Sequence, residues 1–153
     1  MEKQRRVILL FLSALALSCS FSDKKPSIAE FHTTELRENY DGLAPDGSEI
    51  RLLNRLAAGS MVHCTLPANE TSTAVRHKTV EDIWYFMEGE GQVWRKVGDR
   101  EEVTDVKPGI SLTIPLGTHF QFRNDSTNPL RFVIVTMPPW PGKDEAVKVQ
   151  GRW

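Results

Sequence analysis

Short segments in which apolar and polar residues alternate follow one another from Glu49 to Met137. Alternation with a period of two is typical of β-strands that bury one face. Helical spacing of apolar residues is not sustained anywhere in this stretch. The pattern predicts nine strands, over residues 49–54, 60–66, 71–77, 82–88, 92–96, 101–106, 110–114, 119–123 and 130–137.

Turn-forming residues separate these segments. The triplet Gly89-Glu90-Gly91 stands between two of them and predicts a hairpin. Glycine and proline recur at the other junctions, where they supply the backbone angles that tight turns need. Many short strands with turn signals at regular intervals are typical of an all-β sandwich or barrel. The remaining turn signals are Gly98-Asp99, Pro108-Gly109, Pro115-Leu116-Gly117 and Asn128-Pro129.

The N-terminus differs from the rest of the chain. Basic residues precede an apolar run over residues 7–17, and small residues lead to Cys19. This layout is typical of an export signal, and the run is too short to span a bilayer as a mature helix. The ending Ala-Leu-Ser-Cys resembles a bacterial lipobox, in which Cys19 would carry a lipid. Ordinary cleavage after Ser18 is the alternative. We therefore expect an exported protein, periplasmic or lipid-anchored to the bacterial envelope, that meets the membrane only through this segment.

The length of 153 residues indicates one domain. We expect residues 1–19 to be the export signal, 20–40 a polar tether and N-terminal arm, 41–140 the barrel, and 141–153 a C-terminal tail. A formal net charge of -1 and the lack of a basic stripe argue against nucleic acid as a partner. The second cysteine, Cys64, lies in a predicted strand and reads as a small buried apolar residue.

Two sets of spaced residues resemble the motifs of the cupin family. Gly109, Pro115, Gly117 and Asn124 fall on the spacing of the second cupin motif. In the first motif, His77 stands at the second histidine position, Asp82 at the glutamate position, and Gly89 closes the motif. The resemblance implies a double-stranded β-helix, or jelly-roll, barrel. It also implies that two copies pair as a homodimer.

The chain departs from the family at the metal ligands. Val75 stands at the first histidine position and Phe120 at the third. Cupin metal sites resemble an arrangement of imidazoles and a carboxylate around one transition metal, which normally needs three or more protein ligands. An alternative set, reached by a one-residue shift in register, is His63, His77, Glu81 and His119. The cofactor is therefore either absent or one divalent transition metal.

Three hypotheses for function remain open. The leading one is a barrel that binds a small molecule beside a degraded metal site, with a mostly apolar pocket. Its ligand-binding residues would be His77, Glu81, Asp82, Trp84 and Phe120. The second hypothesis is a metal-dependent isomerase or dioxygenase of the kinds that cupins resemble, using the four-residue set above. The third is a non-catalytic interaction module at the envelope, with a filled barrel.

Overall fold

The computed structural model describes residues 30–153, and the predicted export signal with Cys19 lies outside them. Residues 32–153 form one compact unit. Its first residues, 32–40, are exposed and have no regular secondary structure beyond a bend. Among residues 30–153, no helix has the length and hydropathy that spanning a lipid bilayer would require.

Strands and one short helical turn account for the regular structure of residues 30–153. The 3-10 turn η1 spans Lys143–Glu145. The strands are β1 (Gly42–Leu43), β2 (Glu49–Arg55), β3 (Ser60–Leu66), β4 (Val75–His77), β5 (Glu81–Glu88), β6 (Gly91–Val97), β7 (Arg100–Val106), β8 (Ser111–Ile114), β9 (His119–Arg123), β10 (Leu130–Met137) and β11 (Ala146–Lys148).

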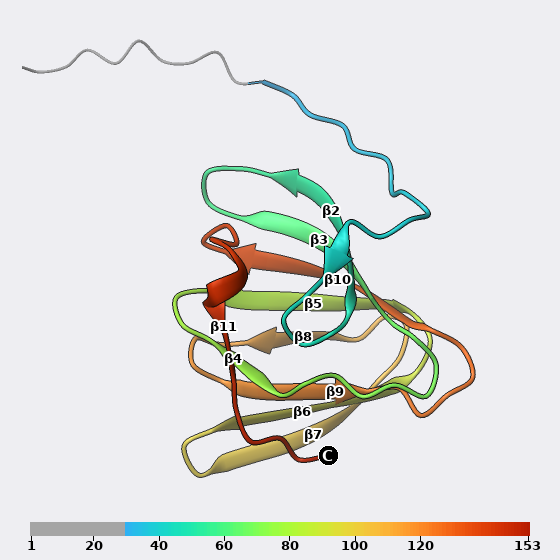
Figure 1. Cartoon of the computed structure of the whole chain (residues 1–153), viewed down its shortest axis with the longest axis vertical. Coiled ribbons are helices and arrows are strands. Elements are labelled where there is room, and N and C mark those ends of the chain that lie inside the picture. The colour runs from blue at the N-terminus through green and yellow to red at the C-terminus, as the bar shows by residue number, and fades with distance from the viewer. Residues whose placement is uncertain (1–29) are drawn as a thin grey trace, which may run out of the picture. The chain divides into compact units, whose positions relative to one another are not determined.

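The strands form two antiparallel sheets that face each other (Figure 1). The first sheet has the order β1-β2-β3-β10-β5-β8, and the second has the order β11-β4-β9-β6-β7. Chain neighbours β4 and β5 therefore lie in different sheets, as do β9 and β10, and the chain crosses repeatedly from one sheet to the other. This is the double-stranded β-helix that the motif spacing predicted.

All nine predicted strands are present, but the segment 71–77 is strand only from Val75 to His77. Ser72 accounts for the difference, because its hydroxyl accepts the hydrogen bond that the Phe122 amide would otherwise give to a backbone carbonyl. The amide of Thr73 bonds instead to the Asp46 carbonyl. The short strands β1 and β11 were not predicted.

Aromatic side chains on the inward faces of both sheets form the centre of the core. Trp84 of β5 meets Phe120 and Phe122 of β9, each with ring centroids 5.4 Å apart and nearly perpendicular planes. Phe132 of β10 lies 4.9 Å from Trp84, and Phe86 lies 4.7 Å from Phe132. Each ring contributes about 1.5–3 kcal/mol by burial, and edge-to-face contacts add to this. Cys64 is fully buried beside these rings, as predicted.

Asn124, the last residue of the second motif, is a fully buried hydrogen-bond centre. Its Nδ2 donates to the carbonyls of Leu66, Pro67 and Asn128, and its Oδ1 accepts from the amide and hydroxyl of Ser126. One amide group thus satisfies backbone groups of two loops that would otherwise be buried without partners. The motif asparagine thereby joins the loop that follows β3 to the loop between β9 and β10.

The C-terminal segment is held by the hydrogen bonds of two side chains, Glu145 and Gln121, and by one strand pairing. The buried carboxylate of Glu145 accepts hydrogen bonds from the amides of Thr79 and Val80 and from the Thr79 hydroxyl, at 2.6, 3.1 and 2.8 Å. β11 then pairs with β4. Further on, Gln121 Oε1 accepts from the amides of Arg152 and Trp153. The tail is therefore part of the second sheet.

We predict that Gly89→Ala destabilises the protein much more than Gly109→Ala. Both glycines have positive φ, 78° and 90°. A Cβ at residue 109 would meet nothing within 4 Å, so only the backbone cost of about 1–2 kcal/mol applies. A Cβ at residue 89 would lie 2.4 Å from the Pro129 carbonyl oxygen, which raises the expected loss to at least ~3 kcal/mol. Urea unfolding midpoints measure both, and equal losses would contradict the clash.

Candidate functional site

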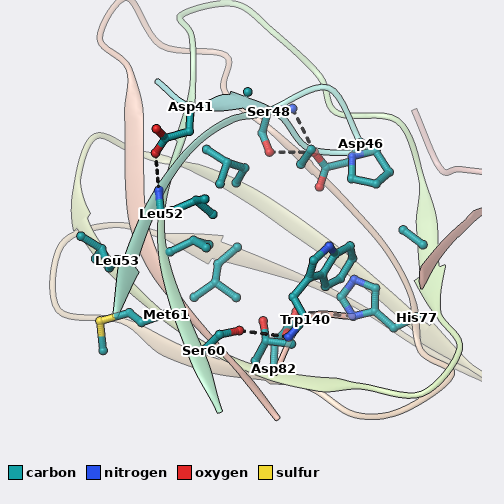
Figure 2. Close-up of a pocket in the computed structure, with 18 of the residues that line it drawn as sticks. Asp41, Asp46, Ser48, Leu52, Leu53, Ser60, Met61, His77, Asp82 and Trp140 are labelled. Atoms are coloured by element: carbon teal, nitrogen blue, oxygen red, sulfur yellow. Dashed lines mark hydrogen bonds and ion pairs between the residues drawn. The ribbon is translucent and has the colours of Figure 1, made fainter. Parts of the chain in front are cut away.

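A cavity of about 450 Å³ lies between the inward faces of the strands and the hairpin of β1 and β2 (Figure 2). This volume is typical of sites for small organic molecules. The wall combines residues of the segment 41–55 with side chains from both sheets and from the C-terminal segment. The wall residues used below are Asp41, Asp46, Arg55, Ser60, Val62, Val75, His77, Asp82, Trp84, Phe120, Thr136, Trp140 and Lys143.

The polar centre of the cavity is the pair His77 and Asp82. His77 is the last residue of β4, and Asp82 lies one residue into β5 in the facing sheet. Both side chains are buried, and His77 Nδ1 lies 3.5 Å from Asp82 Oδ2, which is too far for a strong hydrogen bond. His77 Nδ1 and Asp82 Oδ1 have no hydrogen-bond partner in the structure. The pair therefore offers two unused polar atoms at the wall of an otherwise apolar cavity.

Aromatic rings surround this pair. Phe120 and Trp140 contact the His77 ring from two directions, with centroids 5.1 and 5.2 Å away. The indole of Trp84 donates to Asp82 Oδ2 at 3.3 Å. Trp140 is itself fixed at its backbone, since its amide donates to Ser60 Oγ and its carbonyl accepts from the Arg55 guanidinium. Trp140 therefore covers His77 as part of the cavity wall (Figure 2).

Burial shifts both titrating groups toward their neutral forms. Desolvation lowers the pKa of His77 to about 4, although the Glu145 carboxylate opposes the shift. Desolvation raises the pKa of Asp82 to about 6, against the side chains of Thr136 and Trp84, which favour the carboxylate. At neutral pH the site therefore holds a neutral imidazole beside a buried carboxylate.

Most of the predicted ligand-binding residues lie together at this cavity. His77, Asp82, Trp84 and Phe120 all line it. Glu81 does not, because it is exposed and precedes Asp82 on β5, where neighbouring side chains point to opposite faces of the sheet.

The alternative metal-ligand set does not converge. Among residues 30–153, no group of three or more histidine, cysteine, aspartate or glutamate side chains is arranged to hold a metal ion. His63 lies on β3 between Arg51 and Val133, on the face opposite the buried Cys64, and His119 lies on β9 opposite the buried Phe120. The shift in register needed to gather His63, Glu81 and His119 around His77 is therefore absent, and Phe120 keeps its inward position.

The two positions where cupins carry histidines are direct neighbours here. Val75 of β4 and Phe120 of β9 are cross-strand partners, and both belong to the buried core. An aromatic and a β-branched residue in this arrangement stabilise a sheet by about 0.2–1 kcal/mol. Apolar packing between the two strands thus occupies the place of two imidazoles.

Sequence reasoning missed several wall residues. Thr136 lies directly opposite Asp82 on β10, and its parity with Phe132 could have placed it inward. The contribution of residues 41–55 to the wall had no comparable signal, because β1 is only two residues long. Glu145, which fixes the loop between His77 and Asp82 without lining the cavity, also had no sequence signal, because its partners are 65 and 66 residues away in the sequence.

We predict that the titrations of His77 and Asp82 cancel in the stability of the wild-type protein. Between about pH 4 and pH 6 the folded state keeps a proton on Asp82, whereas the unfolded chain keeps one on His77, because unfolded pKa values are about 3.9 and 6.5. Asp82 alone therefore lowers stability as pH rises through this range, and His77 alone raises it.

Single variants should reveal the two opposing slopes. In Asp82→Asn, the free energy of unfolding should rise by ~3 kcal/mol relative to wild type from pH 4 to pH 6.5, because only His77 still titrates. In His77→Asn, the free energy of unfolding should fall relative to wild type by a similar amount from pH 4 to just above pH 6, because only Asp82 still titrates. Urea unfolding over this range measures both, and three parallel profiles would contradict the assigned shifts.

Comparisons with known proteins agree with this fold. The Cupin_2 family model, described as a cupin domain, matches residues 62–136. The uncharacterized protein MJ1618 of Methanocaldococcus jannaschii is 27% identical over 121 residues, which cover 73% of this chain and 94% of that protein.

Solved structures show the same architecture. A double-stranded β-helix protein from Klebsiella pneumoniae aligns with a TM-score of 0.61 and 17% identity, covering 80% of this chain and all of the other. An RmlC-like cupin from Methanocaldococcus jannaschii aligns with a TM-score of 0.53 and 16% identity, covering 71% and 94%. At these identities the solved structures establish the fold alone. With the family match, the motif spacing and the sheet order in agreement, the chain is a cupin-domain protein.

Proposed function

We propose that this cupin domain binds a small organic molecule in its barrel cavity, with His77 and Asp82 as the polar contacts. The observation that carries the proposal is the pair of buried, unpartnered atoms, His77 Nδ1 and Asp82 Oδ1, at a cavity of about 450 Å³. Leaving such atoms without partners costs stability, so a polar group of a bound molecule that reaches them would recover the lost hydrogen bonds.

The aromatic wall supports the same function. Trp84, Phe120 and Trp140 offer ring surfaces around the polar pair, which is the usual make-up of a small-molecule site. A filled barrel, as a purely structural module would have, leaves no such space. The site acts by binding and orienting, because two polar groups among apolar side chains fix the position of a ligand without providing a nucleophile.

Binding at this site does not need a metal. His77 and Asp82 supply two ligands at most, and Val75 and Phe120 supply none. The metal-dependent isomerase or dioxygenase is therefore the weaker proposal. Metal analysis of the purified protein separates the two, since near-stoichiometric iron, manganese, nickel or zinc that is lost in His77→Ala would favour the enzyme.

A cavity-filling variant tests the binding function directly. We predict that ligands which raise the melting temperature of the wild type in a screen of small organic molecules lose this effect in Val62→Trp. Val62 lines the cavity, and an indole there would occupy part of its volume. A ligand at a hundred times its dissociation constant stabilises the folded state by about 2.7 kcal/mol, so the shift is readily measured.

Val135→Trp is the matched control. Val135 lies on the neighbouring strand β10, next to Ile134 of the cavity wall, and its side chain points to the opposite face. The Val135→Trp variant should keep the full ligand-induced rise in melting temperature. Equal shifts in wild type and Val62→Trp would place the ligands elsewhere and overturn the proposal.

A further inference from the structure

The carboxylate of Asp82 is buried without a cation. Its side chain is 2% exposed, Oδ2 accepts from Trp84, and the side chain of Thr136 also stabilises the carboxylate, but Oδ1 has no hydrogen-bond partner within 3.5 Å. Of residues 30–153, only His77 lies within ion-pair distance, with Nδ1 3.5 Å from Asp82 Oδ2, and no lysine or arginine does. A buried charge normally has a partner of opposite sign, since desolvating it alone is costly.

The surrounding charges make a cation more favourable still. The carboxylates of Asp46 and Glu145 both raise the pKa of Asp82, which means that they add negative potential at its position. Asp46 itself is occupied, because its Oδ1 accepts from the amide and hydroxyl of Ser48. Two cationic residues line the cavity, but both are exposed, and Arg55 bonds the Trp140 carbonyl.

The apolar wall also suits a cation. Trp84, Phe120 and Trp140 line the cavity within ring-contact distance of the polar pair or of one another. Aromatic faces attract ammonium groups, most strongly where water is excluded. The same rings bury an apolar ligand body, so that one ligand could satisfy both features of the wall.

We propose that the cavity takes an organic amine, a protonated primary or secondary ammonium group on an apolar body, with the ammonium donating to Asp82 Oδ1. This inference rests on the proposed binding function and adds the chemical class of the ligand. The volume of about 450 Å³ accommodates a body of one or two rings. The ammonium supplies the missing positive partner, and the rings supply contact with the remainder of the molecule.

A series of probes with one body and three head groups tests the charge. Phenylbutylamine, phenylbutanol and phenylbutyrate present a cation, a neutral donor and an anion on the same chain. Isothermal titration of the full-length protein at neutral pH should find the amine at least about tenfold tighter than the alcohol, because a charge-assisted hydrogen bond is roughly twice as strong as a neutral one. Phenylbutyrate should bind weakest.

Asp82→Asn identifies the group responsible. The asparagine keeps the shape of the side chain but removes its charge, so phenylbutylamine should lose at least about tenfold in affinity while phenylbutanol changes by less than about threefold. Glu81→Gln removes the preceding carboxylate on the exposed face of β5 and should leave both affinities unchanged. Circular dichroism of both variants establishes that they are folded.

The outcomes separate this inference from the binding function. Equal or tighter binding of the alcohol or the anion by the wild type would overturn the amine while leaving a cavity that binds small molecules. Retention of amine affinity in Asp82→Asn would likewise overturn the amine alone. So would a screen in which other ligands raise the melting temperature, Val62→Trp abolishes this effect, and the amine does not bind. The wild-type ratio of amine to alcohol affinity decides the question even if Asp82→Asn fails to fold. If no small molecule gives a shift sensitive to Val62→Trp, both proposals fail.

Discussion

The contact of Trp84 with the rings of Phe120, Phe122 and Phe132 is the constraint on which the other features depend. It joins β5 and β10 of one sheet to β9 of the other, and thereby sets the spacing between the sheets. The ring cluster fills the barrel on one side of Trp84. Trp84 and Phe120 also line the cavity, so that the packed core and the wall of the candidate site share these two rings.

The fixed indole also explains the state of Asp82. Because Trp84 cannot move without disturbing four aromatic contacts, its Nε1–H holds one oxygen of the carboxylate and leaves the other free. The side chain of Thr136 on β10 also favours the charged form of Asp82, whereas the apolar pair Val75 and Phe120 adds no polar partner. A carboxylate at the position of a metal ligand in the family pattern thus keeps one oxygen without a hydrogen-bond partner in a low-dielectric wall.

The alternation of apolar residues and the position of the turns were sufficient to predict the strands, the barrel and the inward direction of Asp82, Trp84 and Phe120. These properties follow from a period of two along each strand, which is local in the sequence. The cavity is different in kind, because it depends on which segments cover the open end. The part played by residues 41–55, and the anchoring of the tail by Glu145, arise from contacts between distant parts of the chain. No periodicity encodes such contacts. His63 and His119 show the converse limit, since residue type made them candidates, while strand parity placed both on the face away from the cavity, where His63 is buried and His119 is half-buried.

Glu145 has a consequence for how this site can change over evolutionary time. Its carboxylate clamps Thr79 and Val80, in the loop that leads from His77 at the end of β4 to Asp82 near the start of β5. The loop between the imidazole and the carboxylate is therefore fixed by a residue in the last tenth of the chain, whose side-chain hydrogen bonds go to neither group. Substitutions in that C-terminal segment can therefore change the positions of the imidazole and the carboxylate while the barrel itself is preserved.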